Sequence, residues 1–436
     1  MSSTASSPAP WPAPHVTGPV DAVVQVPASK SLTNRYLVLA AVADGPSRLR
    51  SPLFSRDSEL MIAALEALGA RIRRVPGEGR FGPDLVVEPI GGTVPDRAVD
   101  CGLAGTVMRF VPPVAALVPG RTSFDGDPHA RARPMGPVVE ALRQLGIQID
   151  DAGSGSLPFT VEGGGRVPGG RLVIDASGSS QFVSALLLVG ARFEEGLHLE
   201  HVGKPVPSLD HIRMTIEVLR GAGVEVDDSV PDHWVVSPGT IRAFDVVIEQ
   251  DLSNAGPFLA AALATGGTVR IPGWPAETTQ VGDLWRDILE RMGATVEYDG
   301  GTLTVTGSGS IAGIDLADAS ELAPTVAALC ALAESPSRLS GIAHLRGHET
   351  DRLAALVAEI NRLGGDAEET ADGIVVRPRP LTGTVVRSYA DHRMATAGAV
   401  IGLRVPGVRV EDIGTTSKTM PEFPGLWADL AATARD

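Results

Sequence analysis

The chain has 436 residues, of which 43% are hydrophobic and 20% charged, and its formal net charge is −15. This length predicts two domains, and the acidic balance argues against a general nucleic-acid binder, which needs a basic surface. No apolar run reaches the roughly 18–20 residues of a membrane span. Cys101 and Cys330 are the only cysteines, which argues against a disulfide framework and fits a cytoplasmic location.

The first segment, residues 1–15, is rich in Ser, Pro and Ala and lacks the apolar core of a signal peptide, so we expect a disordered tail there. An apolar, strand-like run ends at Pro27, and the sequence SKSLTNR then opens an apolar helix. Lys30 and Arg35 therefore stand at a helix start in an acidic chain. The positive end of a helix dipole repels cations, so a bound anion would explain their position.

One pattern recurs along the chain: a helical segment ends at a glycine, and a short β-rich stretch follows. Successive glycines are 77, 77, 70 and 71 residues apart. They are Gly69, Gly146, Gly223, Gly293 and Gly364. Glycine suits the C′ position of a helix, where φ is positive. The spacing predicts six repeated units, if the segment from Val385 is the sixth, in an α/β protein with two lobes. A chance recurrence of a common helix-to-strand joint is the alternative.

A polar motif precedes each of six helices rich in small and apolar residues. The motifs are PASKSLTNR, DCGLAGTVMR, DASGSSQF, DLSNAG, DASELAP and YADHRMA. Their Ser, Thr, Asp and Asn residues can cap helix N-termini, and capping is the plain alternative to a binding role. Capping does not explain the cations at these starts, which favour carboxylate and phosphate ligands. Those cations are Lys30, Arg35, Arg109 and Arg393.

The second helices of the units also begin with charged residues, among them Arg56, Arg131, Arg133, Arg352 and Lys418. A lone arginine is usually a solvated surface charge. Recurrence at one position of the repeat instead indicates a shared cleft that binds more than one anionic group. Glu321 and Glu349 lie in the same motifs, and carboxylates beside a cation cluster can transfer protons.

Seven of these segments together resemble the 5-enolpyruvylshikimate-3-phosphate synthase family: SKSLTNR, LAGTVMRF, ARP, SSQF, HETDRL, YADHRMA and TSKTMPEFP. They occur in order from about Val16 to Trp427. The resemblance implies an α/β fold of two similar globular domains, each made of three βαβαββ units with buried helices, an arrangement called an inside-out barrel. It implies one domain of residues 16–28 and 249–436 and a second of residues 29–248.

The family transfers the enolpyruvyl group of phosphoenolpyruvate to the 5-hydroxyl of shikimate 3-phosphate and releases phosphate, with no cofactor and no metal. By resemblance, Lys30, Glu321 and Glu349 are catalytic. Glu321 is the implied base on the 5-hydroxyl, and Glu349 gives a proton to the pyruvyl carbon and later takes it back. The residues that the resemblance assigns to shikimate 3-phosphate are Lys30, Ser31, Arg35, Ser179, Ser180, Gln181, Ser208, Glu321 and His348. Those assigned to phosphoenolpyruvate are Lys30, Gly105, Arg133, Gln181, Arg352, Arg393 and Lys418.

The sequence departs from the family pattern at four places. Ala28 replaces a usual Gly, which is compatible with a negative φ. Glu321 replaces a common Asp, so the implied base is one methylene longer, and His348 replaces a common Lys. The segment GKPVPS, which ends at Ser208, differs from the common SKPY arrangement.

Two other functions remain as alternatives. The first is the related UDP-N-acetylglucosamine enolpyruvyl transferase, whose members usually carry a Cys in the loop before the Arg-Pro motif. The corresponding loop here, Asp125 to Pro134, has none. The second is a non-catalytic repeat scaffold for anionic partners, which gives no reason for Glu321 and Glu349. We expect a monomer that binds these small molecules, and neither nucleic acid nor membrane.

Overall fold

The structure, a computed structural model, describes residues 9–92 and 95–435. The chain divides into two compact units. Unit 1 takes the described residues up to Val26 and those from Gln250 onward, and unit 2 takes those from Pro27 to Glu249. The chain thus leaves unit 1 just before the helix that begins at Lys30 and returns just before the helix that begins at Leu252.

Unit 2 contains, in its described residues, three sheets of four strands, in the orders β14-β3-β5-β4, β6-β7-β9-β8 and β10-β11-β13-β12. Each sheet begins with a parallel pair and continues with antiparallel neighbours. Thr122 and Phe124 of β7 are buried while their neighbours are not, as expected for a strand with one face on a core. The strands are β3 (Ser47–Arg50), β4 (Arg71–Val75), β5 (Asp84–Glu88), β6 (Arg97–Asp100), β7 (Gly120–Asp125), β8 (Gln148–Asp150), β9 (Phe159–Gly163), β10 (Gly170–Ile174), β11 (Leu197–His201), β12 (Val226–Asp227), β13 (His233–Val236) and β14 (Asp245–Val247).

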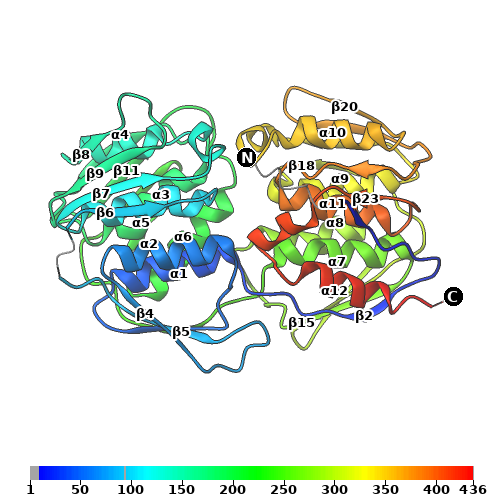
Figure 1. The fold of residues 1–436 in the computed structure, drawn as a ribbon, viewed down its shortest axis with the longest axis horizontal. Coiled ribbons are helices and arrows are strands. Elements are labelled where there is room, and N and C mark those ends of the chain that lie inside the picture. Colours follow the sequence, from blue (N-terminus) through cyan, green and yellow to red (C-terminus); the bar gives the residue numbers. More distant parts are fainter. Residues whose placement is uncertain (1–8, 93–94, 436) are drawn as a thin grey trace, which may run out of the picture. The chain divides into compact units, whose positions relative to one another are not determined.

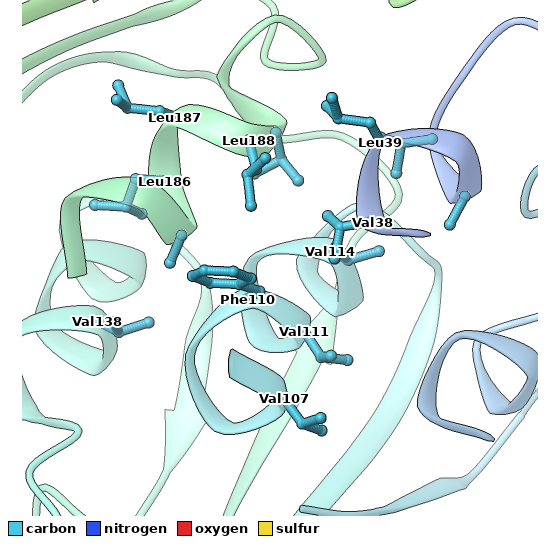
Figure 2. Packing of buried hydrophobic residues seen from close by; sticks show 14 of the residues in the cluster. Val38, Leu39, Val107, Phe110, Val111, Val114, Val138, Leu186, Leu187 and Leu188 are labelled. Carbon is cyan, nitrogen blue, oxygen red and sulfur yellow. The ribbon is translucent and has the colours of Figure 1, made fainter. Parts of the chain in front are cut away.

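Three helices of unit 2 pack against one another inside the unit: α1 (Lys30–Ala41), α3 (Gly105–Ala116) and α5 (Ser180–Gly190). Every residue of α3 is buried, because its sequence GTVMRFVPPVAA is apolar almost all round. Figure 2 shows Phe110 of α3 among Val138 and the leucines of α5, Leu186 and Leu188. The remaining helices are α2 (Arg56–Ala67), α4 (Gly136–Gln144), α6 (Leu209–Gly221) and the 3₁₀ helix η1 (Ala130–Ala132).

Unit 1 repeats this plan, with sheets in the orders β16-β17-β15-β2, β18-β19-β21-β20 and β1-β23-β22 among its described residues. Its strands are β1 (Trp11–Pro12), β2 (Asp21–Val23), β15 (Thr268–Pro272), β16 (Thr295–Asp299), β17 (Thr302–Thr306), β18 (Asp315–Ala317), β19 (Ser337–Ser340), β20 (Asp366–Glu369), β21 (Ile374–Arg377), β22 (Val385–Val386) and β23 (Arg409–Val410). In Figure 1 the blue N-terminal strand β2 runs beside green β15, with which it pairs in parallel. The structure therefore joins the start of the chain to its C-terminal half.

The inner helices of unit 1 are α7 (Leu252–Thr265), α9 (Ala323–Leu332) and α11 (His392–Gly402), which pack pairwise. All residues of α7 are buried. Helices α8 (Trp285–Arg291), α10 (Arg352–Arg362) and α12 (Phe423–Ala431) complete the set with the 3₁₀ helices η2 (Val281–Leu284), η3 (Ser320–Leu322), η4 (Ala343–Gly347) and η5 (Ile413–Lys418). Among the described residues, every helix is too short or too polar to cross a lipid bilayer.

The predicted disordered tail, residues 1–15, is wrong for Trp11 and Pro12. They form β1, which pairs antiparallel with β23, and Trp11 packs on the apolar core of unit 1. The nitrogen of Ala13 also donates to the carbonyl of Val408 at 3.1 Å. Backbone pairing and the burial of one indole order a segment whose composition indicated disorder. Residues 1–8 of the predicted tail lie outside the described residues.

The predicted turn glycines are confirmed. All five have positive φ, between +81° and +105°, and each directly follows the C-cap residue of a helix. The five glycines therefore mark the same feature each time, a turn that leads from the end of a helix into a strand.

Candidate active site

Side chains from the first turns of α1, α3 and α5 meet at one end of unit 2. Asn34 Nδ2 donates to Thr106 Oγ1 at 2.7 Å and joins α1 to α3. Arg109 Nη1 donates to Gln181 Oε1 at 2.7 Å and joins α3 to α5. Three helix starts, each with partial positive charge, thus lie close together. This end of unit 2 favours an anion.

Lys30 is the first residue of α1, after the capping residue Ser29, whose Oγ accepts from the nitrogen of Leu32 at 3.3 Å. Lys30 Nζ donates to Asp57 Oδ2 at 3.2 Å, and Asp57 is buried in the first turn of α2. This carboxylate holds the ammonium group at the helix start. Sequence reasoning did not assign Asp57, because an acid in a first helical turn already has an explanation in the helix dipole.

Arg35 is 1% exposed and joins α1 to α6. Its Nε donates to Thr215 Oγ1 at 2.8 Å, and its Nη2 donates to the carbonyl of His211 at 3.0 Å. Its Nη1 donates to the carbonyl of Ser31 at 3.0 Å. Arg35 therefore has a structural role in unit 2, and its contact with a substrate stays a prediction.

Arg133 follows η1 and is 8% exposed. Its Nη1 donates to the carbonyl of Leu103 at 3.0 Å, and its Nε is buried without a hydrogen-bond partner among the described residues. Gly105 opens α3 beside this guanidinium: a Cβ on Gly105 would lie 2.9 Å from Arg133 Nη2 and 3.1 Å from Gln181 Oε1. No side chain caps α3. A guanidinium, an amide and an uncapped helix start therefore adjoin at a point where an added Cβ would require the two side chains to shift.

The start of α5 carries the predicted hydroxyl groups. Ser179 Oγ accepts from the nitrogen of Gln181 at 3.2 Å and caps the helix, and Ser180 is buried as its first residue. Arg109 Nη1 lies 3.4 Å from Ser179 Oγ. Ser208 precedes α6 with a φ of +54° and does not cap that helix with its side chain. Such a conformation is costly for a non-glycine residue and typical of functional sites.

In unit 1, Glu349 lies between two cations. Arg352 Nη2 donates to Glu349 Oε2 at 2.9 Å, and Lys418 Nζ donates to Glu349 Oε1. The side chains of all three residues are less than 10% exposed. The ends of η5 and the start of α10 thus place two positive groups around one carboxylate.

Asp391 fixes the direction of Arg352. Its Oδ2 accepts from Arg352 Nε at 2.7 Å, and its Oδ1 accepts from Arg352 Nη2 at 3.2 Å. The same carboxylate caps α11 by accepting from the nitrogen of Arg393 at 2.9 Å. Burial disfavours the charge of the Arg352 guanidinium, but Asp391 and Glu349 outweigh this effect and hold its pKa above the ordinary value. Asp391 stands in the motif YADHRMA, but its place before a helix is already explained by capping, so the sequence did not indicate its contact with Arg352.

Glu321 lies in η3, directly before α9. Ser253 Oγ, from the start of α7, donates to Glu321 Oε1 at 2.9 Å. Arg393 Nη2, from the start of α11, lies 3.6 Å from the same oxygen. The starts of the three inner helices of unit 1 therefore converge, as they do in unit 2. Sequence reasoning did not assign Ser253.

His348 contacts the same cluster: its Nδ1 lies 3.2 Å from Arg352 Nη1. A guanidinium can only donate, so a hydrogen bond between these two atoms requires Nδ1 as the acceptor. Nδ1 also lies 4.0 Å from Glu349 Oε2.

The other arginines that the repeat singled out lie on the surface. Arg56 pairs with Asp127 at 2.8 Å and Arg131 with Asp125 at 2.7 Å, and both arginine side chains are about half exposed. Ala28 is not among the described residues with positive φ, as its replacement of a glycine required.

The fold and these clusters define a class: an α/β protein of two units, in which the starts of inner helices carry cations and, in unit 1, two carboxylates in contact with them. The chain belongs to the EPSP synthase (3-phosphoshikimate 1-carboxyvinyltransferase) family, whose model matches residues 15–427.

Two curated relatives cover almost the whole chain. The 3-phosphoshikimate 1-carboxyvinyltransferase of Kocuria rhizophila is 60% identical over 430 residues, which are 97% of this chain and 97% of that protein. The protein of the same name from Mycobacterium ulcerans is 55% identical over 433 residues, 98% of each chain. A solved EPSP synthase from Acinetobacter baumannii has a similar fold, with a TM-score of 0.77 at 23% identity over 97% of this chain and 98% of that one.

Proposed function

We propose that this protein transfers the enolpyruvyl group of phosphoenolpyruvate to the 5-hydroxyl of shikimate 3-phosphate and releases inorganic phosphate. One observation carries the proposal, namely that unit 1 brings two carboxylates into contact with cations. Glu349 is held between Arg352 and Lys418, and Glu321 lies beside Arg393. A reaction of addition followed by elimination needs groups that give and take protons, and carboxylates beside a cation cluster can do this.

Shikimate 3-phosphate binds chiefly to the cluster of unit 2. The hydroxyls and N–H groups of Ser179 and Ser180 at the start of α5 hold the 3-phosphate, because a helix N-terminus favours an anion. Lys30 and Arg35 supply positive charge, with Ser31, Gln181 and Ser208 as polar contacts. Glu321 and His348 act on the 5-hydroxyl. We assign the contact of His348 with this oxygen to its imidazole ring, at a position where many members of the family have a lysine.

Phosphoenolpyruvate binds to four cations, which are Arg133, Arg352, Arg393 and Lys418. Guanidinium groups bind carboxylate and phosphate oxygens in pairs of hydrogen bonds, which suits a substrate with both groups. Lys30 and Gln181 add contacts, and Gly105 leaves room for the substrate beside its backbone N–H.

The reaction proceeds by addition and elimination. Glu321 takes the proton of the 5-hydroxyl of shikimate 3-phosphate while the oxygen of this hydroxyl attacks C2 of phosphoenolpyruvate. Glu349 protonates C3. Glu349 then removes a proton from the new methyl group, the C2–O bond to phosphate breaks, and the enol ether forms. Once the anionic substrate engages Arg352 and Lys418, the adjacent negative charge favours protonated Glu349, which prepares it as the donor.

The alternative functions gain no support from the family match. A phosphate-release assay separates them. We expect release that requires shikimate 3-phosphate and phosphoenolpyruvate together. Release with UDP-N-acetylglucosamine as acceptor would indicate the related transferase, and the absence of release with either acceptor would contradict an enzyme of this kind.

We further propose that the protein acts as a cytoplasmic monomer, without nucleic acid or membrane as partners. Its acidic balance argues against nucleic acid as a partner, and its two buried, unpaired cysteines fit the cytoplasm. Size-exclusion chromatography with light scattering tests the oligomeric state. A mass of twice 45.2 kDa would contradict the monomer.

A further inference from the structure

Glu359 lies on α10, two helical turns after Arg352, and is 3% exposed. Residues seven positions apart lie on the same face of a helix. Arg352 and Glu359 therefore both face the chain segment of residues 387–391. Arg352 contacts its last residue, Asp391, and Glu359 contacts its beginning.

The carboxylate of Glu359 binds this segment twice. Its Oε2 accepts from the nitrogen of Arg387 at 3.0 Å, and its Oε1 accepts from the hydroxyl of Tyr389 at 2.6 Å. Arg362 Nε also donates to Oε2, at 3.0 Å, from a side chain that is 35% exposed. The buried acid thus has one partner on its own helix and two on the segment.

The segment needs such support, because its backbone is unfavourable. Tyr389 and Ala390 have φ values of +53° and +54°, in the left-handed region that non-glycine residues rarely adopt. Two such residues in succession persist only where surrounding contacts impose them. Immediately after them come Asp391, which fixes Arg352 and caps α11, and Arg393.

We propose that Glu359 and Tyr389 are positioning residues for phosphoenolpyruvate. Their hydrogen bond holds the left-handed turn, and the turn aims Asp391 at Arg352 and sets the start of α11 with Arg393. Neither residue has to touch the substrate. The inference rests on the proposed function for the identity of the ligand, but the ordering of the turn does not depend on it.

The test compares Tyr389→Phe and Glu359→Gln with the control Arg377→Met, which removes an arginine of unit 1 that pairs at the surface with Asp366 and Glu368. Tyr389→Phe removes one hydroxyl, so it reports even if Glu359→Gln fails to fold. We expect the KM for phosphoenolpyruvate to rise about 3- to 10-fold in Tyr389→Phe, the size of one lost hydrogen bond to a charged group reduced by partial relaxation. The dissociation constant of shikimate 3-phosphate in Tyr389→Phe and the KM of Arg377→Met should stay within about twofold of wild type.

Hydrogen exchange without ligand supplies a readout that is independent of the reaction. Amides of residues 386–394 should exchange faster in Tyr389→Phe than in wild type and in Arg377→Met. Unchanged exchange there, or an equal loss of affinity for both substrates, would overturn the inference. Absence of phosphate release by the wild-type protein would instead overturn the proposed function. The exchange result would still decide whether Tyr389 orders the turn.

Discussion

Arg133 and Gly105 illustrate what single residues decide. Among the described residues, Arg133 donates to the carbonyl of Leu103 while its buried Nε has no hydrogen-bond partner, and Gly105 has no side chain beside that guanidinium. A buried cation without a carboxylate is costly unless an anion completes it. These two residues therefore allow the sharpest tests of ligand binding.

The resemblance to the family implies inhibition by glyphosate at the site assigned to phosphoenolpyruvate. We therefore expect Gly105→Ala to weaken glyphosate strongly and to raise the KM for phosphoenolpyruvate more modestly. The added methyl would meet Arg133 Nη2 at 2.9 Å and Gln181 Oε1 at 3.1 Å, so these side chains must shift. Inhibition constants and KM values are to be measured for both proteins. Gly136→Ala is the control, since Gly136 also opens a helix of unit 2 but has open space around it. An unchanged ratio of inhibition constant to KM, with a lower melting temperature, would reduce Gly105 to a packing role.

Arg133→Ala should weaken phosphoenolpyruvate much more than shikimate 3-phosphate. A lost charge-assisted contact is worth roughly 1.5–3 kcal/mol, or about 10- to 150-fold in affinity. Calorimetry of each ligand by itself measures the two effects, because the two substrates together would react. Arg131→Ala is the matched control, since Arg131 lies two residues earlier on the same loop but pairs with Asp125 at the surface. Equal losses for both ligands would show that Arg133 has been assigned to the wrong substrate.

Among the elements, β1 has the clearest effect on architecture. It lies beside β23 in the position that β21 occupies beside β19, so the third sheet of unit 1 is completed by the N-terminal segment. Strand β23 leads through residues 411 and 412 into η5, which carries Lys418. A strand far away in the sequence thus supports the element before a predicted binding residue.

Trp11→Ala should lower the free energy of unfolding by roughly 1–3 kcal/mol, the range for removing most of a partly buried large side chain. Urea unfolding followed by far-UV circular dichroism is the measurement, because the substitution removes a fluorophore. Val23→Ala is the control, since Val23 lies on β2 with 64% of its surface exposed. If both variants unfold at the wild-type urea concentration, β1 contributes pairing without stability.

The whole molecule consists of two units with separate apolar cores. Most residues that the proposal assigns to shikimate 3-phosphate lie in unit 2, at the starts of α1, α5 and α6. A ligand stabilises the state that binds it, by about 2.7 kcal/mol at a concentration of 100 times its dissociation constant.

Shikimate 3-phosphate alone should therefore slow hydrogen exchange most in unit 2, at residues 30–35, 179–184 and 208–212. Exchange at residues 256–265 of α7, which lie after the start of the helix and carry none of the assigned residues, serves as the internal reference. Sulfate at the same ionic strength controls for unspecific anion binding. Equal protection of α7 and of the three segments would contradict a substrate site built chiefly on unit 2.

The sequence by itself determined much of this protein. Glycine at five helix ends follows from the local need for positive φ, and apolar residues all round α3 and α7 require enclosed helices, so both could be read without coordinates. The cations and acids at helix starts could be selected because they violate the preference of the helix dipole or exceed what capping needs.

Only the tertiary structure decided which partner each of these groups has. Asp57 and Asp391 look like ordinary helix-start acids in the sequence, yet they hold Lys30 and Arg352 from 27 and 39 residues away. Arg35 and Arg133 both look like ligand-binding cations, yet Arg35 is hydrogen-bonded to α6, while the buried Nε of Arg133 has no partner in the part of the chain that the structure describes. Trp11 lies in a segment of disordered composition and becomes a strand because β23 offers a free edge. Local patterns report backbone needs within a few residues, whereas pairing across hundreds of residues depends on how the chain packs.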